Sequence, residues 1–230
     1  MFSLFLPEQC LHCEQPSAHS CNRTLKEPLS HYLCEVCLRI LNNQAAPQER
    51  MVRDEFGRLG SWIEFTHTLA AYVFVAESPL QSVIHAMKYD DMMKLGSHLG
   101  ISLSYLVPKQ VNVIVPVPLH RTRLAERGYN QAEVIAKAIT AQSNTNVVRA
   151  AKRTRPTPSQ TNLSLPKRIE NVRGAFALTR HASEIKGKNV LIVDDVMTTG
   201  STLASVAETL HEAKPKSIST LALAIATPTN

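Results

Sequence analysis

The sequence predicts an α/β protein with a parallel sheet and flanking helices, preceded by a small metal-binding module. Helical and strand-like patterns alternate from about residue 66 and end in a strand–helix–strand unit over residues 189–226. Continuous apolar strands of this kind are typical of parallel sheets covered on both faces. Two closely spaced cysteine pairs stand before residue 40. We therefore expect two units: residues 1–60 with the module and a linker, and residues 61–230 with the α/β domain.

The composition narrows the class of protein. The chain has 230 residues, of which 44% are hydrophobic and 19% are charged, and these values exclude wholesale disorder. No apolar run approaches the roughly 18–20 residues needed to span a bilayer, so we expect no membrane insertion. The apolar start at Met1 lacks the basic segment of a signal peptide. We expect a cytoplasmic protein.

The positive charge is concentrated in one stretch. The formal net charge is +6, and residues 121–173 hold 11 of the 25 lysines and arginines but three of the 19 acids. Such asymmetry indicates an anionic partner, either a phosphate ligand or a nucleic acid. A solvated loop with no partner is the alternative.

The four cysteines Cys10, Cys13, Cys34 and Cys37 form two Cys-x2-Cys pairs. The two-residue spacer lets both thiolates of a pair reach one ion, and two pairs complete a tetrahedral site. We favour structural Zn²⁺ over disulfides, which need an oxidising compartment, and over a redox pair. Four thiolates leave no position for a catalytic water. Residues 14–33 look like a polar loop without a core, so the module would depend on the metal, and Cys21 stands outside the pattern.

The larger unit contains recognisable elements. Strands are expected over residues 68–75, 111–117, 189–193 and 217–226, and helices from Ser78, over 92–106, over 131–141 and over 201–213. Ser78 and Pro79 suit the N-cap and first position of a helix. Residues 152–175 hold three prolines and no apolar period, so we expect a long exposed loop there.

A segment rich in small polar residues joins the strand expected over residues 189–193 to the helix expected over residues 201–213. Asp194 and Asp195 are followed by Thr198, Thr199, Gly200, Ser201 and Thr202. Backbone amides, hydroxyl groups and the positive end of a helix dipole together suit a phosphate monoester. The two acids would repel that phosphate, and they suit sugar hydroxyls or a Mg²⁺ ion instead. A simple capped helix is the alternative, but it explains neither the acid pair nor five small polar residues.

The segment VLIVDDVMTTGST, residues 190–202, resembles the phosphoribosyl pyrophosphate (PRPP) signature of type I phosphoribosyltransferases at all 13 positions. The resemblance implies that Asp194 and Asp195 contact the ribose hydroxyls of PRPP, bound with Mg²⁺. It implies that residues 198–202 bind the 5′-phosphate. Some proteins with this signature only bind nucleotides, so the resemblance leaves catalysis open.

Four further segments resemble the ComF family, the competence and GntX-like branch of that superfamily. They are Val115-Pro-Val-Pro-Leu-His-Arg121-x-Arg123, Arg127-Gly-Tyr-Asn-Gln131, Met87-Lys88-Tyr89, and Arg168-x2-Asn171-Val172-x-Gly174-Ala175-Phe176, in addition to the two cysteine pairs. The resemblance implies that the four cysteines bind zinc. It also implies a role in natural transformation, acting on imported single-stranded DNA, with no acceptor base established.

The basic residues supply candidates for anion contacts. Lys88, Arg121 and Arg123, the last two in a loop after the strand at 111, are candidates for the pyrophosphate. A second group could form a lid on the ligand or a DNA clamp: Arg127, Lys152, Arg153, Arg155, Lys167, Arg168 and Arg173. Tyr89 and Tyr129 could stack on bases, although packing in the core is favoured for each.

Three functions remain open at this point. The first is a PRPP-binding protein of phosphoribosyltransferase fold that handles imported single-stranded DNA, with a protein of the competence machinery as a further partner. The second is a nucleobase-salvage phosphoribosyltransferase with structural zinc. The third is a non-enzymatic DNA or protein interaction module. We rank them in this order, and whether the chain is an enzyme is left open.

Overall fold

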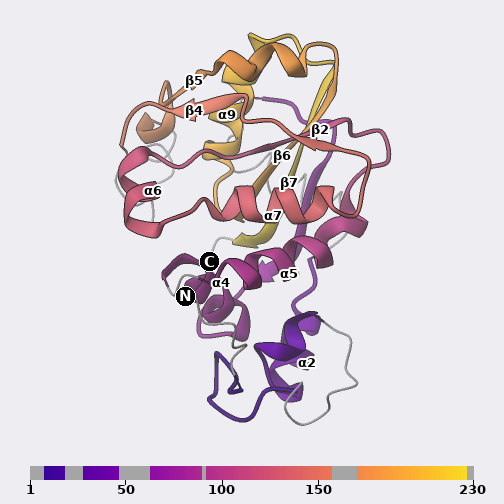
Figure 1. Cartoon of the computed structure of the whole chain (residues 1–230), viewed down its shortest axis with the longest axis vertical. Coiled ribbons are helices and arrows are strands. Elements are labelled where there is room, and N and C mark those ends of the chain that lie inside the picture. Colours follow the sequence, from indigo (N-terminus) through magenta and orange to yellow (C-terminus); the bar gives the residue numbers. More distant parts are fainter. Residues whose placement is uncertain (1–7, 19–27, 47–62, 90–91, 157–169, 227–230) are drawn as a thin grey trace.

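A computed structural model describes residues 8–18, 28–46, 63–89, 92–156 and 170–226 (Figure 1). Its centre is a five-stranded parallel sheet in the order β1-β7-β6-β2-β3. The strands are β1 (Thr68–Phe74), β2 (Val113–Pro116), β3 (Asn146–Val147), β6 (Asn189–Met197) and β7 (Ser217–Ala226). A separate antiparallel pair joins β4 (Ala151–Arg153) to β5 (Phe176–Leu178). The predicted parallel α/β architecture is confirmed.

Both faces of the sheet are covered, because successive side chains of the central strands point to opposite sides. On one side, Leu191 and Val193 of β6 join a cluster with α4 (Pro79–Tyr89), α5 (Met93–Leu103) and α7 (Gln131–Thr140). On the other side, Val190 and Ile192 pack with α9 (Ser201–His211) and the β4–β5 pair. The short helix η2 (Ser104–Leu106) follows α5, and the short helix η4 (Arg180–Ile185) follows β5.

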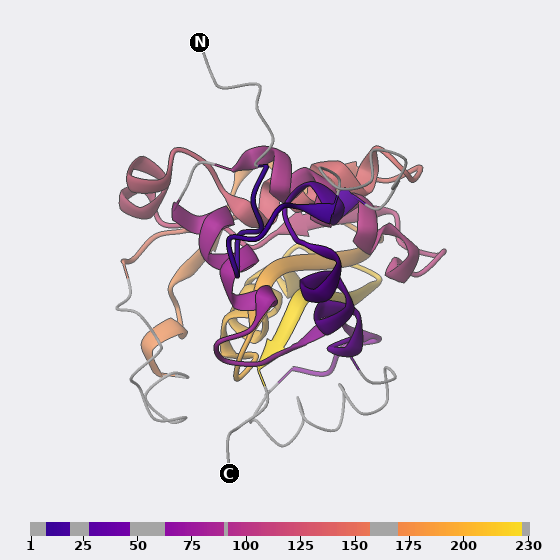
Figure 2. The same cartoon turned by 90° about the horizontal axis from the view of Figure 1, so that it is seen from below.

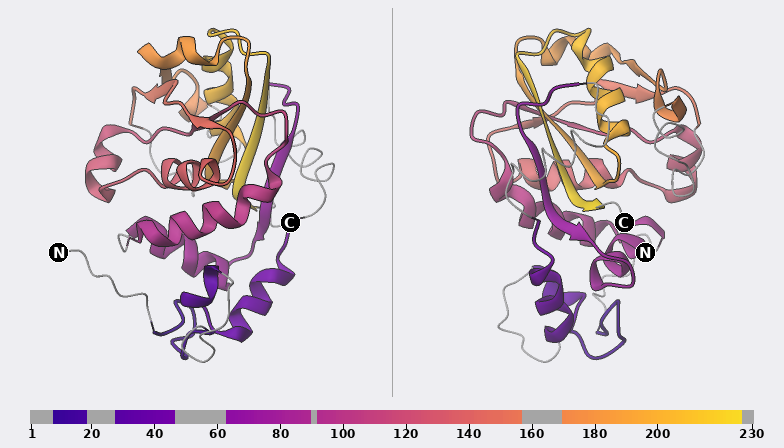
Figure 3. Two further views of the ribbon diagram at one scale, coloured as in Figure 1. Left: turned by 45° about the vertical axis from the view of Figure 1, so that its right-hand side comes forward. Right: turned by 180° about the vertical axis from the view of Figure 1, so that it is seen from behind.

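The N-terminal module contains η1 (Pro28–His31) and α2 (Glu35–Asn43). It lies beyond α4 and α5, at the end of the molecule away from the sheet (Figure 3), and in front of the strands when seen from below (Figure 2). Leu29, Tyr32 and Leu33 are fully buried and join the cluster of α4 and α5. The expectation of a polar loop without a core is therefore wrong for residues 28–33, because these side chains pack against a distant part of the chain, whereas residues 19–27 lie outside the described residues.

Backbone hydrogen bonds also attach the module to the sheet. Ala46 N donates to Ala71 O at 2.7 Å, and Val73 N donates to Gln44 O at 2.7 Å. An isolated antiparallel bridge pairs Ala45 with Tyr72 of β1. The segment after α2 therefore covers the outer edge of β1. The boundary expected at residue 60 lies in 47–62, outside the described residues, and stays a prediction.

Most predicted elements of the larger unit are present, with three differences. Strand β6 runs on to Met197, so Asp194 and Asp195 lie within it. Residues 121–127, expected as a loop, form helix α6 (Arg121–Arg127), which buries no side chain and therefore has no apolar periodicity. The expected loop at 152–175 begins inside β4 and leads into β5. Among the described residues, no helix has the length and apolar character to cross a membrane.

Candidate functional site

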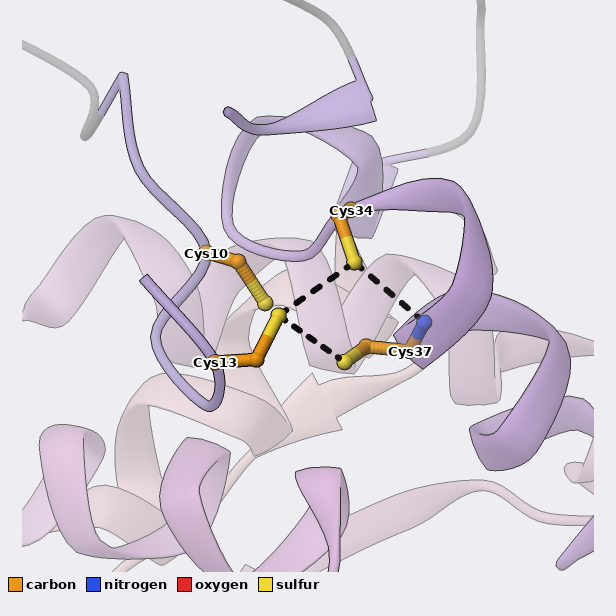
Figure 4. A group of neighbouring side chains, drawn as sticks. All are labelled: Cys10, Cys13, Cys34 and Cys37. Carbon is orange, nitrogen blue, oxygen red and sulfur yellow. Dashed lines mark hydrogen bonds between the residues drawn. The ribbon is translucent and has the colours of Figure 1, made fainter. Parts of the chain in front are cut away.

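The four cysteines converge on one point in the N-terminal module (Figure 4). Their sulfur atoms all lie within 4.8 Å of one another. The Sγ of Cys13 is 3.6 Å from that of Cys34 and 3.7 Å from that of Cys37. Thiolates on a tetrahedral Zn²⁺ with bonds of about 2.3 Å stand about 3.8 Å apart. The donor set and spacing fit a closed structural zinc site.

Local backbone structure builds each half of the cluster. Cys34 is the N-cap of α2, and its Sγ accepts a hydrogen bond from Cys37 N at 3.5 Å. Burial raises the pKa of Cys37, and contact with the other thiols raises it further. Burial also acts to raise the pKa of Cys10, but hydrogen bonds from the backbone amides of Cys13 and Cys34 lower it to about 7. Zn²⁺ would favour the thiolate form of all four.

A contact links this cluster to the α/β core. His12, between the first two cysteines, has its Nδ1 3.0 Å from Ser82 Oγ in α4. Leu11 N donates to Tyr32 O at 2.8 Å, inside the module. The first cysteine pair is thus fixed to the helix that also reaches the second polar site, described next.

The second site is a cavity of about 550 Å³ at the carboxyl ends of β1, β6 and β7. Ligands of open α/β sheets bind at this edge. Asp194 and Asp195 line it from β6. Lys88, in the last turn of α4, places its Nζ 2.7 Å from Asp195 Oδ2. Lys88 is therefore a cationic partner of the acid pair, contributed by a different layer of the fold.

The pKa values of the two carboxyl groups shift in opposite directions in the folded protein. Burial raises the pKa of Asp194 well above its usual value, and the charge of Asp195 raises it further. Burial also acts to raise the pKa of Asp195, but the ammonium of Lys88 outweighs it, so the net shift of this pKa is downward. Asp195 is the carboxylate of the pair, and Asp194 carries the proton more readily. A bound cation would remove this asymmetry by stabilising both charges.

The residues after β6 form the other end of the cavity. Thr198, Gly200 and Thr202 line it, at the N-terminus of α9. Gly200 is in the left-handed conformation with φ 69°, which glycine adopts without strain. Thr199 and Ser201 are buried, and their hydroxyl groups lie 2.8 Å apart. The predicted loop thus divides into three residues that face the cavity and two that hold the turn.

Two of the arginines predicted to contact an anion, Arg127 and Arg153, also line the cavity. Arg127 ends α6, and its Nη1 donates to Gln131 Oε1 at 3.2 Å. Arg153 of β4 also lines the cavity, with its guanidinium carbon 5.4 Å from the ring centroid of Phe176. Burial lowers the pKa of Arg153, and the charge of Asp194 acts in the opposite direction. Arg153 was expected in an exposed loop, and strand pairing with β5 brings it to the acid pair instead.

The remaining basic candidates lie elsewhere. Arg121 and Lys152 line a neighbouring cavity of about 670 Å³, which shares Arg153 with the first. Arg123 is 3.9 Å from Glu126 on the surface of α6. Arg155 donates from Nη2 to the carbonyls of Asn171 and Arg173, at 3.2 and 3.0 Å. Arg173 itself is exposed, and Lys167 and Arg168 lie outside the described residues.

The sequence did not single out several residues of the cavity. Gln131 is buried beside Arg127, and Asn130 caps α7 while its Nδ2 donates to Val117 O at 3.0 Å. The N-cap preference of asparagine was a usable signal for Asn130. Tyr129 is buried and donates to Met87 O, as packing in the core predicts. Tyr89, also expected to be packed, is 59% exposed and lines the cavity.

Together, the fold and the cavity define a protein of the phosphoribosyltransferase fold. A family model described as "Phosphoribosyl transferase domain" matches residues 124–228. Structures with weaker likeness include glutamine PRPP amidotransferase of Bacillus subtilis, 18% identical over 55% of this chain and 25% of that one, with a TM-score of 0.39. A hypoxanthine phosphoribosyltransferase of Staphylococcus aureus is 20% identical over 60% and 65%, with a TM-score of 0.35.

The curated relatives with similar sequences carry names from competence and DNA utilization. Competence protein F of Haemophilus influenzae is 31% identical over 58% of this chain, which spans 62% of that protein's length. DNA utilization protein YhgH of Escherichia coli is 29% identical over 87% of this chain and 77% of its own. Competence protein ComFC of Bacillus subtilis is 25% identical over 91% and 84%. In sequence, the chain resembles the ComF family over most of its length.

Proposed function

We propose that this protein binds PRPP together with Mg²⁺ in the 550 Å³ cavity and acts in the handling of imported single-stranded DNA. The observation that carries the proposal is the position of the acid pair. Asp194 and Asp195 face a cavity whose far end is a helix N-terminus with a left-handed glycine. A cavity lined by both carboxylates and a helix N-terminus suits a sugar with a phosphate at one end.

The residues present also suit Mg²⁺. This ion takes oxygen ligands, usually one or two carboxylates together with substrate phosphates, and the acid pair offers both carboxylates. When bound, Mg²⁺ would neutralise charge on the pyrophosphate. Asp194 and Asp195 would hold the ion or the ribose hydroxyls, and Arg153 and Lys88 would add positive charge beside the anion.

Calorimetric titration of PRPP with Mg²⁺ tests this proposal. We expect micromolar affinity, about −8 kcal/mol, for the wild type. In D194A/D195A the affinity should fall below detection, and T199A, which alters the turn without facing the cavity, should weaken binding less. A folded, zinc-loaded wild type that does not bind PRPP would refute the proposal and favour a non-enzymatic module.

Single-stranded DNA is the partner that the neighbouring cavity supports. Arg121 and Lys152 line this cavity with Arg153, which also lines the proposed PRPP site. Relatives named for competence and for DNA utilization support the same partner. Positive side chains along a groove provide salt-dependent contacts to a phosphate backbone.

Fluorescence anisotropy with a labelled single-stranded oligonucleotide tests the DNA contacts. We expect R121A/K152A to weaken binding and to reduce its salt dependence, because each side chain would release counterions on binding. The charge-matched control R180A/K186A removes two cations from η4 and the residue after it, which do not line this cavity. Equal effects of the two double variants would show only a general charge effect. A salvage enzyme is instead favoured if some nucleobase releases pyrophosphate from PRPP.

A further inference from the structure

The N-terminal module meets α5 at a pair of histidine rings. His31 ends η1 and His98 lies in α5, and their ring centroids are 6.0 Å apart, with an angle of 24° between the planes. The ring centroid of Tyr32 is 5.6 Å from that of His98, at an interplanar angle of 61°. Tyr32 is 2% exposed and packs in the core cluster that the module shares with α4 and α5. His98 therefore contacts the module through two rings where the two units pack together.

One ring nitrogen of His98 is buried without a hydrogen bond. Its Nδ1 has no partner among the residues that the structure describes. A neutral imidazole can carry its proton on Nε2 and leave Nδ1 as an acceptor, whereas an imidazolium ion has an N–H donor at both nitrogens. Burying an unpaired charged donor costs more than burying an unpaired neutral acceptor. The packed position of His98 therefore favours the neutral ring.

The charges around His98 act in the same direction. Burial lowers the pKa of His98, and the positive charge of Lys94, one turn earlier on α5, lowers it further. His31 faces the ring from the module. A proton on both histidines would place two cations against each other, and like charges disfavour the charged form.

The other elements near His98 direct their charged groups elsewhere. α7 packs on Gly96 and Gly100, which are two positions from His98 and so on the opposite side of α5. η2 contains no charged residue. Among the described residues, the titratable and charged groups that face the ring are therefore those of His31, Tyr32 and Lys94. The remaining groups have other partners or are exposed: Glu133 with Lys137 in α7, Lys88 with Asp195, His85 with Tyr89, and Glu35 and Arg39 on the surface of α2.

We propose that His98 makes the attachment of the N-terminal module to α5 sensitive to protons, so that the module is held by the neutral ring and loosened by the protonated one. Docking is then complete above the usual histidine pKa of about 6.5 and weakens as the pH falls below it, because the undocked state binds the proton more readily. Buried Leu29 and Leu33 oppose full release. This device is independent of the proposed PRPP and DNA sites.

Hydrogen exchange of the full-length, zinc-loaded protein between pH 5.5 and pH 8, corrected for intrinsic exchange rates, tests the proposal. We expect the protection of backbone amides in η1 and α2 to fall below pH 6.5, by up to about tenfold per pH unit, the limit for one proton. Amides of β6 and β7 should keep their protection. H98F should remove the pH dependence, because a phenyl ring packs in a similar way and does not titrate. H211F replaces an exposed histidine of α9 and should behave as the wild type.

Lys94 provides a second test that leaves the packed rings unchanged. K94A should raise the pKa of His98, measured by NMR of the ring, and should move the loss of protection to higher pH. K109A removes an exposed lysine beyond η2 and should do neither.

Metal analysis at each pH separates this device from protonation of the cysteines, which would release zinc and loosen the module by itself. Protection that falls as steeply in H98F as in the wild type would overturn the proposal, and so would a K94A profile that coincides with that of the wild type. If H98F does not fold, the comparison of K94A with K109A decides.

Discussion

The cysteine cluster and the acid-pair cavity are built in different ways. All four sulfur atoms come from two short segments, each with its two cysteines three positions apart in sequence. The cavity draws Asp195 from β6, Lys88 from α4, and Arg153 from β4. A metal site needs a few ligands at close range, which short-range spacing supplies. A cavity for a sugar phosphate needs groups spread over a larger volume, and tertiary packing has to bring those groups together.

The two regions also differ in what they contribute to stability. Zinc would stabilise its module directly, because the ion binds the folded state and not the unfolded chain. The acid pair opposes folding unless a partner compensates, because two partly buried carboxyl groups repel each other. Three predictions test this contrast, from the largest expected effect to the smallest.

Removal of zinc should have the largest effect. C34S or a strong chelator should unfold the N-terminal module, because structural zinc supplies about 10–16 kcal/mol of apparent folding free energy in small modules. Metal analysis and limited proteolysis of the full chain measure the loss. C21S is the matched control, since the other four cysteines form the cluster. A variant without zinc that resists proteolysis as the wild type does would show that packing against α4 and α5 is sufficient.

The two aspartates should respond oppositely to amide substitution. Folding raises the pKa of Asp194, so its ionisation costs stability above the unfolded-state pKa of about 3.9, increasingly up to the folded-state value. D194N should therefore stabilise the ligand-free protein at pH 7. Folding lowers the pKa of Asp195, so its stabilising contribution is present above the unfolded-state pKa and is lost as pH falls. D195N should be destabilising at pH 7.

Urea denaturation between pH 4 and pH 8 measures both effects. The advantage of D194N should shrink as the pH falls toward 4. The deficit of D195N should stay nearly constant over this range, because it is lost only below the unfolded-state pKa of about 3.9. If D194N and D195N changed the free energy of unfolding in the same direction at pH 7, the assignment of the charge to Asp195 would be contradicted. Because both variants alter the proposed PRPP site, a stabilised D194N that no longer binds PRPP would also separate stability from function.

The contact between His12 and Ser82 should have the smallest effect. A side-chain hydrogen bond contributes about 0.5–1.5 kcal/mol, so H12A and S82A should each lower the free energy of unfolding by about 1 kcal/mol. A double-mutant cycle isolates the coupling between the module and α4. S97A removes an exposed hydroxyl that donates to Met93 O within α5, and it serves as the control. Additive effects of H12A and S82A would mean that this bond does not couple the two regions.

Local patterns in the sequence were sufficient to predict the long helices and strands and part of the candidate site. The start of α4 at Pro79, the helix at 131 and the strand at 217 follow from capping residues and apolar periodicity. Helix α6 was missed because a helix that buries no side chain has no such periodicity, although Gly128 at its left-handed C-cap was a signal. The short strand β4 was missed because Ala-Lys-Arg becomes a strand only by pairing with Phe176–Leu178, more than 20 residues away.

By itself, the sequence determined the parallel α/β class, and it singled out the four clustered cysteines and the acid pair beside a loop of small polar residues, because each depends on residues close together in the chain. The tertiary structure alone decided which cations meet the acids, that Tyr89 lies open at the cavity, and that the module shares a core with α4 and α5. These features depend on distances between segments that are far apart along the chain. Such distances are set by the packing of whole helices and strands, which no local pattern encodes.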